Sequence, residues 1–85
     1  MRIFETTKFS RLREKLKSAA EREGLKKAVQ AVEKDPAAGK KLKGEFRDLR
    51  SFRYSVQGQA RRLIYHWEGA HLTLLSFGPR EGIYK

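Results

Sequence analysis

The sequence predicts a single α+β domain, residues 1–85, in which two helices pack on one face of an antiparallel sheet. Three observations predict this class. The chain has 85 residues, too few for two separate cores. Apolar residues recur with helical spacing in the first half and alternate with period two in the second half. The implied order is a strand, two helices and a three-stranded meander, with both helices over one sheet face.

The first half of the chain contains a short strand and two amphipathic helices. Residues 1–7 are typical of a strand, after which Thr6 and Thr7 can cap a helix. The helices are predicted from two periodic sets of apolar residues: Phe9, Leu12, Leu16, Ala19 and Ala20, then Leu25, Ala28, Val29 and Val32. We expect Glu23-Gly24 to separate two antiparallel helices and Asp35-Pro36 to end the second. A lysine-rich loop follows at residues 37–44.

The second half of the chain predicts three strands, at residues 49–56, 61–67 and 72–77. The last of them is almost continuously apolar, which indicates a central strand. Turns are expected around Gly58 and Gly69, because glycine favours tight connections. Gly78-Pro79 ends the last strand and leaves residues 80–85 as a tail.

The loop of the first hairpin determines which basic side chains meet. A loop of residues 58–59, or one of residues 57–60, places Ser55 opposite Arg62 and Arg53 opposite Ile64; a three-residue loop would break this register. In this register one face carries Arg53, Ser55, Arg62 and His66. The helices are expected to cover the other, aromatic face, because the apolar area lies there. The arginine face then remains open, and Arg80 joins it if the last strand lies beside residues 61–67.

The charge of the chain indicates a polyanionic partner. The formal net charge is +10, and residues 40–85 hold ten basic against four acidic side chains. Such a charge is typical of proteins that bind nucleic acid, an anionic membrane or an acidic protein. The chain has no cysteine, which excludes a disulfide scaffold and a thiolate metal site. It also has no signal peptide and no membrane-spanning run, so we expect a soluble cytoplasmic domain.

Several arginines on one face favour a bound anion. Any one of them, taken alone, is typical of a solvated surface. Together they repel one another unless an anion lies between them. Tyr84, the aromatic residue of the tail, would then stack on a base while the arginines hold phosphate. The alternative is a tyrosine that packs the C-terminus against the domain.

An ordered set of motifs extends over nearly the whole chain: Lys41-Leu42-Lys43-Gly44, Leu49-Arg50-Ser51-Phe52-Arg53-Tyr54, Arg62-Leu63-Ile64-Tyr65 and Gly78-Pro79-Arg80-Glu81-Gly82-Ile83-Tyr84. This set resembles the RelE/ParE toxin superfamily, and RelE-type messenger-RNA interferases in particular. The resemblance implies the RelE/ParE-like fold and the toxin of a type II toxin–antitoxin pair. It further implies a ribosome-dependent endoribonuclease with a basic cleft, and a small acidic antitoxin as partner.

The resemblance also implies a catalytic set of four residues: Arg53, Arg62, Arg80 and Tyr84. Arg53 resembles the first basic residue of the hairpin's leading strand, and Arg62 the arginine of the family's Arg-Leu-Val-Tyr strand. Arg80 and Tyr84 resemble the arginine and tyrosine of the C-terminal segment. The family's second basic residue, typically lysine, falls at Ser55. The tail between Arg80 and Tyr84 is shorter than in the type member.

Cleavage through the 2′-hydroxyl requires a base for that hydroxyl, stabilisation of a phosphorane and protonation of the leaving 5′-oxygen. Arginine suits the second task, because its guanidinium binds phosphate in bidentate fashion and stays charged. His66 is a candidate base, but it lies four residues from Arg62, about 13 Å along a strand. We therefore interpret His66 as a surface or packing histidine, and expect Glu81 to pair with Arg80 rather than act as base. No metal site or cofactor is expected, since two histidines without convergent carboxylates are not a ligand set.

Five further basic residues of the second half form a predicted RNA-binding set: Lys40, Lys41, Lys43, Arg50 and Arg61. Lysines of this kind contact phosphate without reading sequence. Two alternatives to the nuclease stay open. One is a ParE-like toxin that poisons DNA gyrase by binding and cuts no RNA. The other is a catalytically weak relative that only binds RNA or antitoxin.

Overall fold

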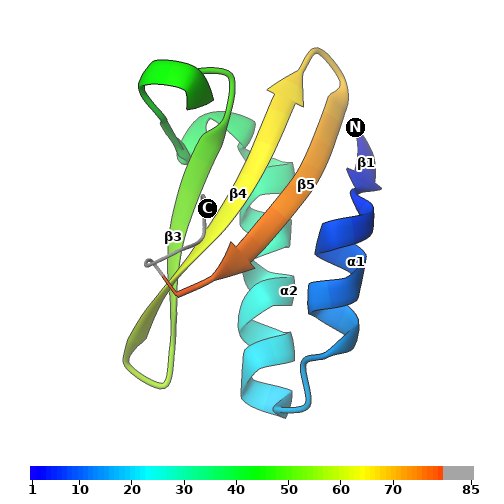
Figure 1. Cartoon of the computed structure of the whole chain (residues 1–85), viewed down its shortest axis with the longest axis vertical. Coiled ribbons are helices and arrows are strands. Elements are labelled where there is room, and N and C mark those ends of the chain that lie inside the picture. The colour runs from blue at the N-terminus through cyan, green and yellow to red at the C-terminus, as the bar shows by residue number, and fades with distance from the viewer. Residues whose placement is uncertain (80–85) are drawn as a thin grey trace.

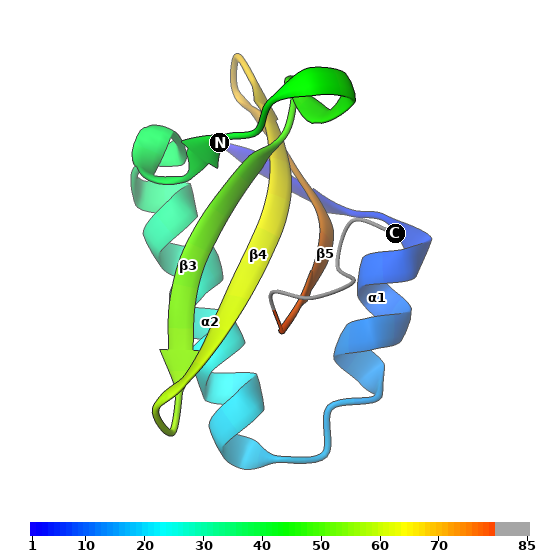
Figure 2. The same ribbon diagram turned by 60° about the vertical axis from the view of Figure 1, so that its left-hand side comes forward.

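The computed structural model describes residues 1–79 and contains two helices and five strands within them. In chain order they are β1 (Arg2–Glu5), α1 (Thr7–Glu14), α2 (Ala19–Lys34), β2 (Lys40–Lys41), β3 (Arg50–Val56), β4 (Gln59–Glu68) and β5 (His71–Gly78). Short 3₁₀ turns, η1 (Pro36–Ala38) and η2 (Gly44–Phe46), lie on either side of β2. The strands form one sheet in the order β1-β5-β4-β3-β2, and both helices lie on the same side of it (Figures 1 and 2).

This architecture confirms the predicted α+β class, with two differences in the sheet. β3, β4 and β5 pair antiparallel, as expected. β2 lies in the segment that was expected to be a lysine-rich loop and pairs antiparallel with β3, whereas β1 pairs parallel with β5, so the sheet is mixed. Arg2 lies opposite His71, and Glu5 lies opposite Leu74. A parallel partner requires a long connection, which the intervening helices and strands supply. The last strand, which was expected to be central, is an interior strand between β1 and β4, while β4 holds the middle position of the sheet.

The predicted break between the helices at Glu23-Gly24 is wrong. α1 ends at Glu14, and α2 runs from Ala19 through Gly24 to Lys34. The Ser18 side chain caps α2, because its hydroxyl accepts the backbone N–H of Glu21 at 3.3 Å. Gly24 lies inside α2, where it allows close packing and does not end a helix. A Cβ at this position would lie 2.6 Å from Cγ2 of Val56, so the glycine lets α2 approach β3 closely.

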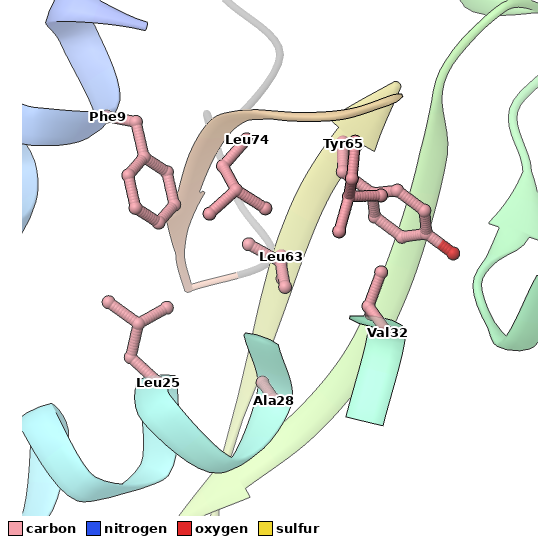
Figure 3. Close-up of a cluster of buried hydrophobic side chains, with 8 residues drawn as sticks. Phe9, Leu25, Ala28, Val32, Leu63, Tyr65 and Leu74 are labelled. Carbon is pink, nitrogen blue, oxygen red and sulfur yellow. The ribbon is translucent and has the colours of Figure 1, made fainter. Parts of the chain in front are cut away.

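The core lies between the helices and the covered face of the sheet (Figure 3). It is formed by one buried residue of α1, three of α2 and four of the strands: Phe9, Leu25, Ala28, Val32, Leu63, Tyr65, Leu72 and Leu74. Phe9 meets Phe77 edge to face, with ring centroids 5.1 Å apart. The helices therefore cover the aromatic face of the hairpin strands, as predicted, and the opposite face is left to Arg53 and Arg62.

The Tyr65 hydroxyl connects this core to the segment before β2. It donates a hydrogen bond to the Pro36 carbonyl and accepts one from the Gly39 N–H at 2.9 Å. The Tyr65 side chain is fully buried, and burial raises the pKa of its hydroxyl. The neutral phenol is thus kept as donor and acceptor, and it fixes the point from which Lys40 and Lys41 extend.

The predicted register of the β3–β4 hairpin is wrong by two positions. Gln57 and Gly58 form the loop, with φ of 50° and 81°, as a type I′ turn requires. Arg53 consequently faces Arg62, while Ser55 faces Ala60. The predicted pairs, Ser55 with Arg62 and Arg53 with Ile64, do not form. Because side chains alternate with period two, a shift of two residues leaves every side chain on its predicted face.

Candidate nucleic-acid interface

Arg53 and Arg62 lie directly opposite each other on the sheet face that the helices leave open. Opposed residues of an antiparallel pair have Cβ atoms about 5 Å apart. Arg53 is exposed and Arg62 is half-buried. Two arginines that start from opposed positions on one face concentrate positive charge there, which suits the binding of an anion.

A cleft of about 530 Å³ joins these arginines to the lysine segment. Its lining residues come from β2, β3, β4 and the loops around β2: Ala38, Lys40, Lys41, Leu42, Lys43, Ser51, Arg53 and Arg62. β2 holds the lysines in place, because Lys40 pairs with Ser51 on β3. The Leu42 N–H also donates to the Leu49 carbonyl at 3.0 Å. Five predicted site residues thus meet in one cleft: Lys40, Lys41, Lys43, Arg53 and Arg62.

Arg61 does not reach this cleft. It lies on the helix side of the sheet, where its Nε donates to Oε1 of Glu21 at 2.9 Å. Its other nitrogens donate to the Ala60 carbonyl and to the Gln59 side chain. Neighbouring Tyr54 is affected by this pair: burial and the Glu21 carboxylate raise its pKa to about 12, while Arg61 opposes the shift. Arg61 therefore contributes to the packing of α2 on the sheet.

Arg50 is also engaged within the domain. Its Nη1 donates to the Gly39 carbonyl at 2.8 Å, which attaches the start of β3 to the segment before β2. The same guanidinium lies 5.4 Å from the centroid of the Trp67 ring, within the range of a cation–π contact. Arg50 does not line the cleft of Arg53 and Arg62.

The other predicted catalytic residues, Arg80 and Tyr84, lie outside the described residues, as does Glu81. Gly78, the last residue of β5, faces Arg62 across the β4–β5 pair. His66 is half-buried and pairs with Thr73, and it lines a different pocket from Arg62. Within residues 1–79, no three His, Asp or Glu side chains gather into a potential metal site.

Residues 3–85 match the family model described as a ParE-like toxin of type II bacterial toxin–antitoxin system. The chain belongs to this family. The predicted membership of the RelE/ParE superfamily is therefore confirmed. A search of curated proteins finds no match for this ParE-like toxin.

Solved structures resemble the ParE-like toxin in fold. A chain of the intact E. coli RelBE toxin–antitoxin complex is 24% identical, with a TM-score of 0.73 over 93% of this chain and 95% of that chain. The YoeB/ParE toxin from Agrobacterium tumefaciens is 18% identical, with a TM-score of 0.77 over 94% and 99% of the two chains. The isolated E. coli RelE toxin is 24% identical, with a TM-score of 0.72 over 93% and 83%.

Two features of the ParE-like toxin escaped the sequence analysis. One is the contact of Trp67 with Arg50, which depends on how far β4 extends beyond the start of β3 and has no periodic signature. The other is a cavity of about 780 Å³ between the helices and β1, bordered by apolar residues such as Phe4, Phe9 and Leu25 and by charged ones such as Arg13 and Lys26. Phe4 itself is 46% exposed. No helix of the described chain, residues 1–79, is long and apolar enough to cross a bilayer.

Proposed function

We propose that this toxin is a ribosome-dependent endoribonuclease that cleaves translated messenger RNA. The observation that carries the proposal is the pairing of Arg53 with Arg62 in a cleft also lined by three lysines. A protein that only binds an anionic partner needs positive charge on its surface but no particular pairing of its cations. Two arginines opposed on neighbouring strands suit a single phosphate that must be held while its charge increases.

The chemistry divides among the site residues in a defined way. The 2′-oxygen of the substrate attacks phosphorus, the bond to the 5′-oxygen breaks, and a 2′,3′-cyclic phosphate and a 5′-hydroxyl result. Arg62 and Arg80 would hold the scissile phosphate and stabilise the phosphorane, with Arg53 supporting them from the opposite strand. Tyr84 would stack on or orient the nucleotide at the cut. The proton of the 2′-hydroxyl passes to a base outside this arginine set, since a guanidinium keeps its protons, and the leaving 5′-oxygen takes a proton from water.

Lys40, Lys41 and Lys43 would bind the RNA backbone beside the scissile phosphate. Lysine ammonium groups contact phosphate without sequence preference, and such binding weakens as salt increases. The attachment of this segment to Tyr65 restricts its movement relative to Arg53 and Arg62. The cleft would therefore accept a strand through its backbone, while the ribosome presents the codon.

The partner that we infer is an acidic antitoxin encoded beside the toxin. The positive cleft suits an acidic segment, which would occupy the place of the RNA phosphates. The exposed apolar residues of β1, Ile3 and Phe4, border a cavity that a protein partner can fill. The RelBE structure that this fold resembles is itself a toxin–antitoxin complex. Action on ribosomes would place the toxin in the cytoplasm.

The test is brief induction of the toxin in growing cells, followed by primer extension on translated messages. We expect new 5′ ends inside codons within minutes of induction, and no such ends with the Arg53→Ala/Arg62→Ala double variant. Arg11→Ala, which removes an exposed arginine of α1, serves as a matched control and should cleave like the wild type. Intact messages in cells arrested by the wild-type toxin would refute the nuclease.

Inhibition of DNA gyrase is the second candidate, and two observations favour it. The matched family model is that of ParE-like toxins. Ser55 faces Ala60, so the hairpin end of the arginine face carries no further cation at these two positions. In this case induction would leave messages intact and inhibit DNA supercoiling, which a plasmid topology gel from the same cultures would detect.

A further inference from the structure

Trp67 forms an exposed aromatic platform near the C-terminal end of β4, beside the turn that connects β4 to β5. It is the chain's single tryptophan, and 37% of its surface is exposed. Two contacts fix the ring: Nε1 donates to the Gly69 carbonyl at 2.9 Å, and the Arg50 guanidinium lies 5.4 Å from the ring centroid. Arg50 is in turn held by the Gly39 carbonyl. The indole is therefore oriented in advance, while part of its surface remains open to a ligand.

The platform borders a pocket of about 390 Å³ that is distinct from the cleft of Arg53 and Arg62. Lys41 and Arg47 contribute cations to the pocket, beside Arg50 and Trp67. Lys41 also lines the cleft of the two arginines, so the two depressions adjoin at this lysine. Arg62 and Trp67 are five residues apart on β4, about 17 Å along the strand, and this odd separation places their side chains on opposite faces of the sheet. The connecting nucleotides would therefore pass over the edge strand β2 at Lys41. A few extended nucleotides can bridge this separation.

We propose that this pocket binds one base of single-stranded RNA, continuous with the strand in the neighbouring cleft. The base stacks on Trp67, and the phosphates on either side of it contact Lys41 and Arg47. The inference rests on the proposed function, and it extends the RNA path beyond the scissile phosphate. An aromatic ring next to cations is the usual arrangement for single-stranded nucleic acid, because every base presents a π-face while its backbone needs positive charge.

Two carboxylates in the same pocket fit a base better than a further phosphate. Asp48 and Glu68 line the pocket together with the cations. A carboxylate accepts hydrogen bonds and repels phosphate, whereas the edge of a base offers amino and imino N–H donors. The base is therefore expected to enter between the acidic residues, with the backbone on the side of Lys41. This mixed charge is also why the pocket suits one nucleotide rather than a long stretch of backbone.

Because Trp67 is the only tryptophan, intrinsic fluorescence reports directly on this site. The probe is a short oligoadenylate with 2′-O-methyl groups, which cannot be cleaved through the 2′-oxygen. We expect saturable quenching that weakens as salt rises. In fluorescence anisotropy with a labelled oligonucleotide, Trp67→Ala should lower affinity roughly 5- to 150-fold, the value of one stacked base. Phe4→Ala, which removes an exposed aromatic residue on β1, is the matched control and should leave affinity unchanged.

Three results would overturn the inference. The first is oligonucleotide binding by anisotropy without quenching and with Trp67→Ala at wild-type affinity; this result leaves the arginine cleft intact as the RNA site. The second is equal quenching by duplex RNA, whose bases are not available for stacking. The third is the absence of any binding at low salt. Circular dichroism of Trp67→Ala excludes unfolding as the cause of lost affinity, and Trp67→Phe, which keeps an aromatic ring, should recover part of it. Messenger cleavage is scored separately, so the nuclease can fail or hold independently.

Discussion

Arg53 on β3 and Arg62 on β4 are cross-strand partners, and both point to the side of the sheet that the helices do not cover. Like charges directly opposite each other in a sheet are unfavourable for folding. Their shared place in one cleft is the geometric basis of the phosphate site proposed above. The lysines of the neighbouring segment reinforce this potential within the same cleft.

The first prediction concerns the two arginines themselves. Arg62→Ala should lower the rate of messenger cleavage by about 100-fold or more, because a preorganised charge at the phosphorane is lost. Arg62→Lys should retain the charge but lose bidentate binding, and its activity should be intermediate. The unfolding temperature of Arg53→Ala should be no lower than that of the wild type, because the substitution removes one charge of a like-charge pair. A fully toxic double variant would show that the site lies elsewhere.

The second prediction separates Arg61 from the RNA site. Arg61→Ala should lower the free energy of unfolding by about 1 kcal/mol, because the half-buried Glu21 carboxylate loses its partner. Urea denaturation measures this loss. RNA cleavage per folded molecule should stay at the wild-type level. A fall in RNA affinity with unchanged stability would instead assign Arg61 to RNA contact, as the sequence analysis expected.

The third prediction concerns stability at high pH. The pKa of Tyr54 is raised to about 12 by burial, with Glu21 adding to the shift, so the fold favours the neutral phenol. The contribution of the neutral Tyr54 side chain to stability is complete below pH 10, where tyrosine in the unfolded chain is neutral as well. It is lost as pH rises from 10 towards 12, by about 2 kcal/mol.

Urea denaturation at a series of pH values should show this decline, and Tyr54→Phe should reduce it. Tyrosinate absorbance provides an independent check. If all tyrosines ionised together at the ordinary pKa, neither Tyr54 nor Tyr65 would be protected by the core.

The fourth prediction tests the link between the core and the cleft. In Gly39→Ala the new Cβ would collide with the Tyr65 hydroxyl, so the segment before β2 must move. We expect lower stability together with weaker RNA binding, because Lys40 and Lys41 leave their places. Gly24→Ala is the matched control: its Cβ meets Val56 on the helix side, so it should cost stability without altering RNA affinity per folded molecule. If the two variants bound RNA with equal affinity, the geometry of the cleft would not depend on the contact with Tyr65.

Patterns of period two and 3.6 were sufficient for the fold class, the three hairpin strands and the sheet face of Arg53 and Arg62. The break between the helices was misplaced because glycine was treated as a helix terminator, whereas Gly24 meets a packing demand from Val56 that no local pattern reveals. A local signal was present at Ser18 and Glu21, whose spacing is that of a capping box. The hairpin register was wrong because the two-residue loop is formed by Gln57 and Gly58, in a type I′ turn, and not by Gly58 and Gln59. The parallel partner of β1 lies 69 residues away and could not be inferred locally.

The pairing of β1 with β5 also has a consequence for biosynthesis. The first strand has no neighbour in the sheet until the last strand has emerged from the ribosome, since Arg2 pairs with His71. α1 and α2 consist of local contacts and can form earlier, but the sheet that carries the arginine cleft is completed late. The five-stranded sheet therefore closes only after β5 has been translated. Strands β2, β3 and β4, whose residues line the arginine cleft, can pair before that step.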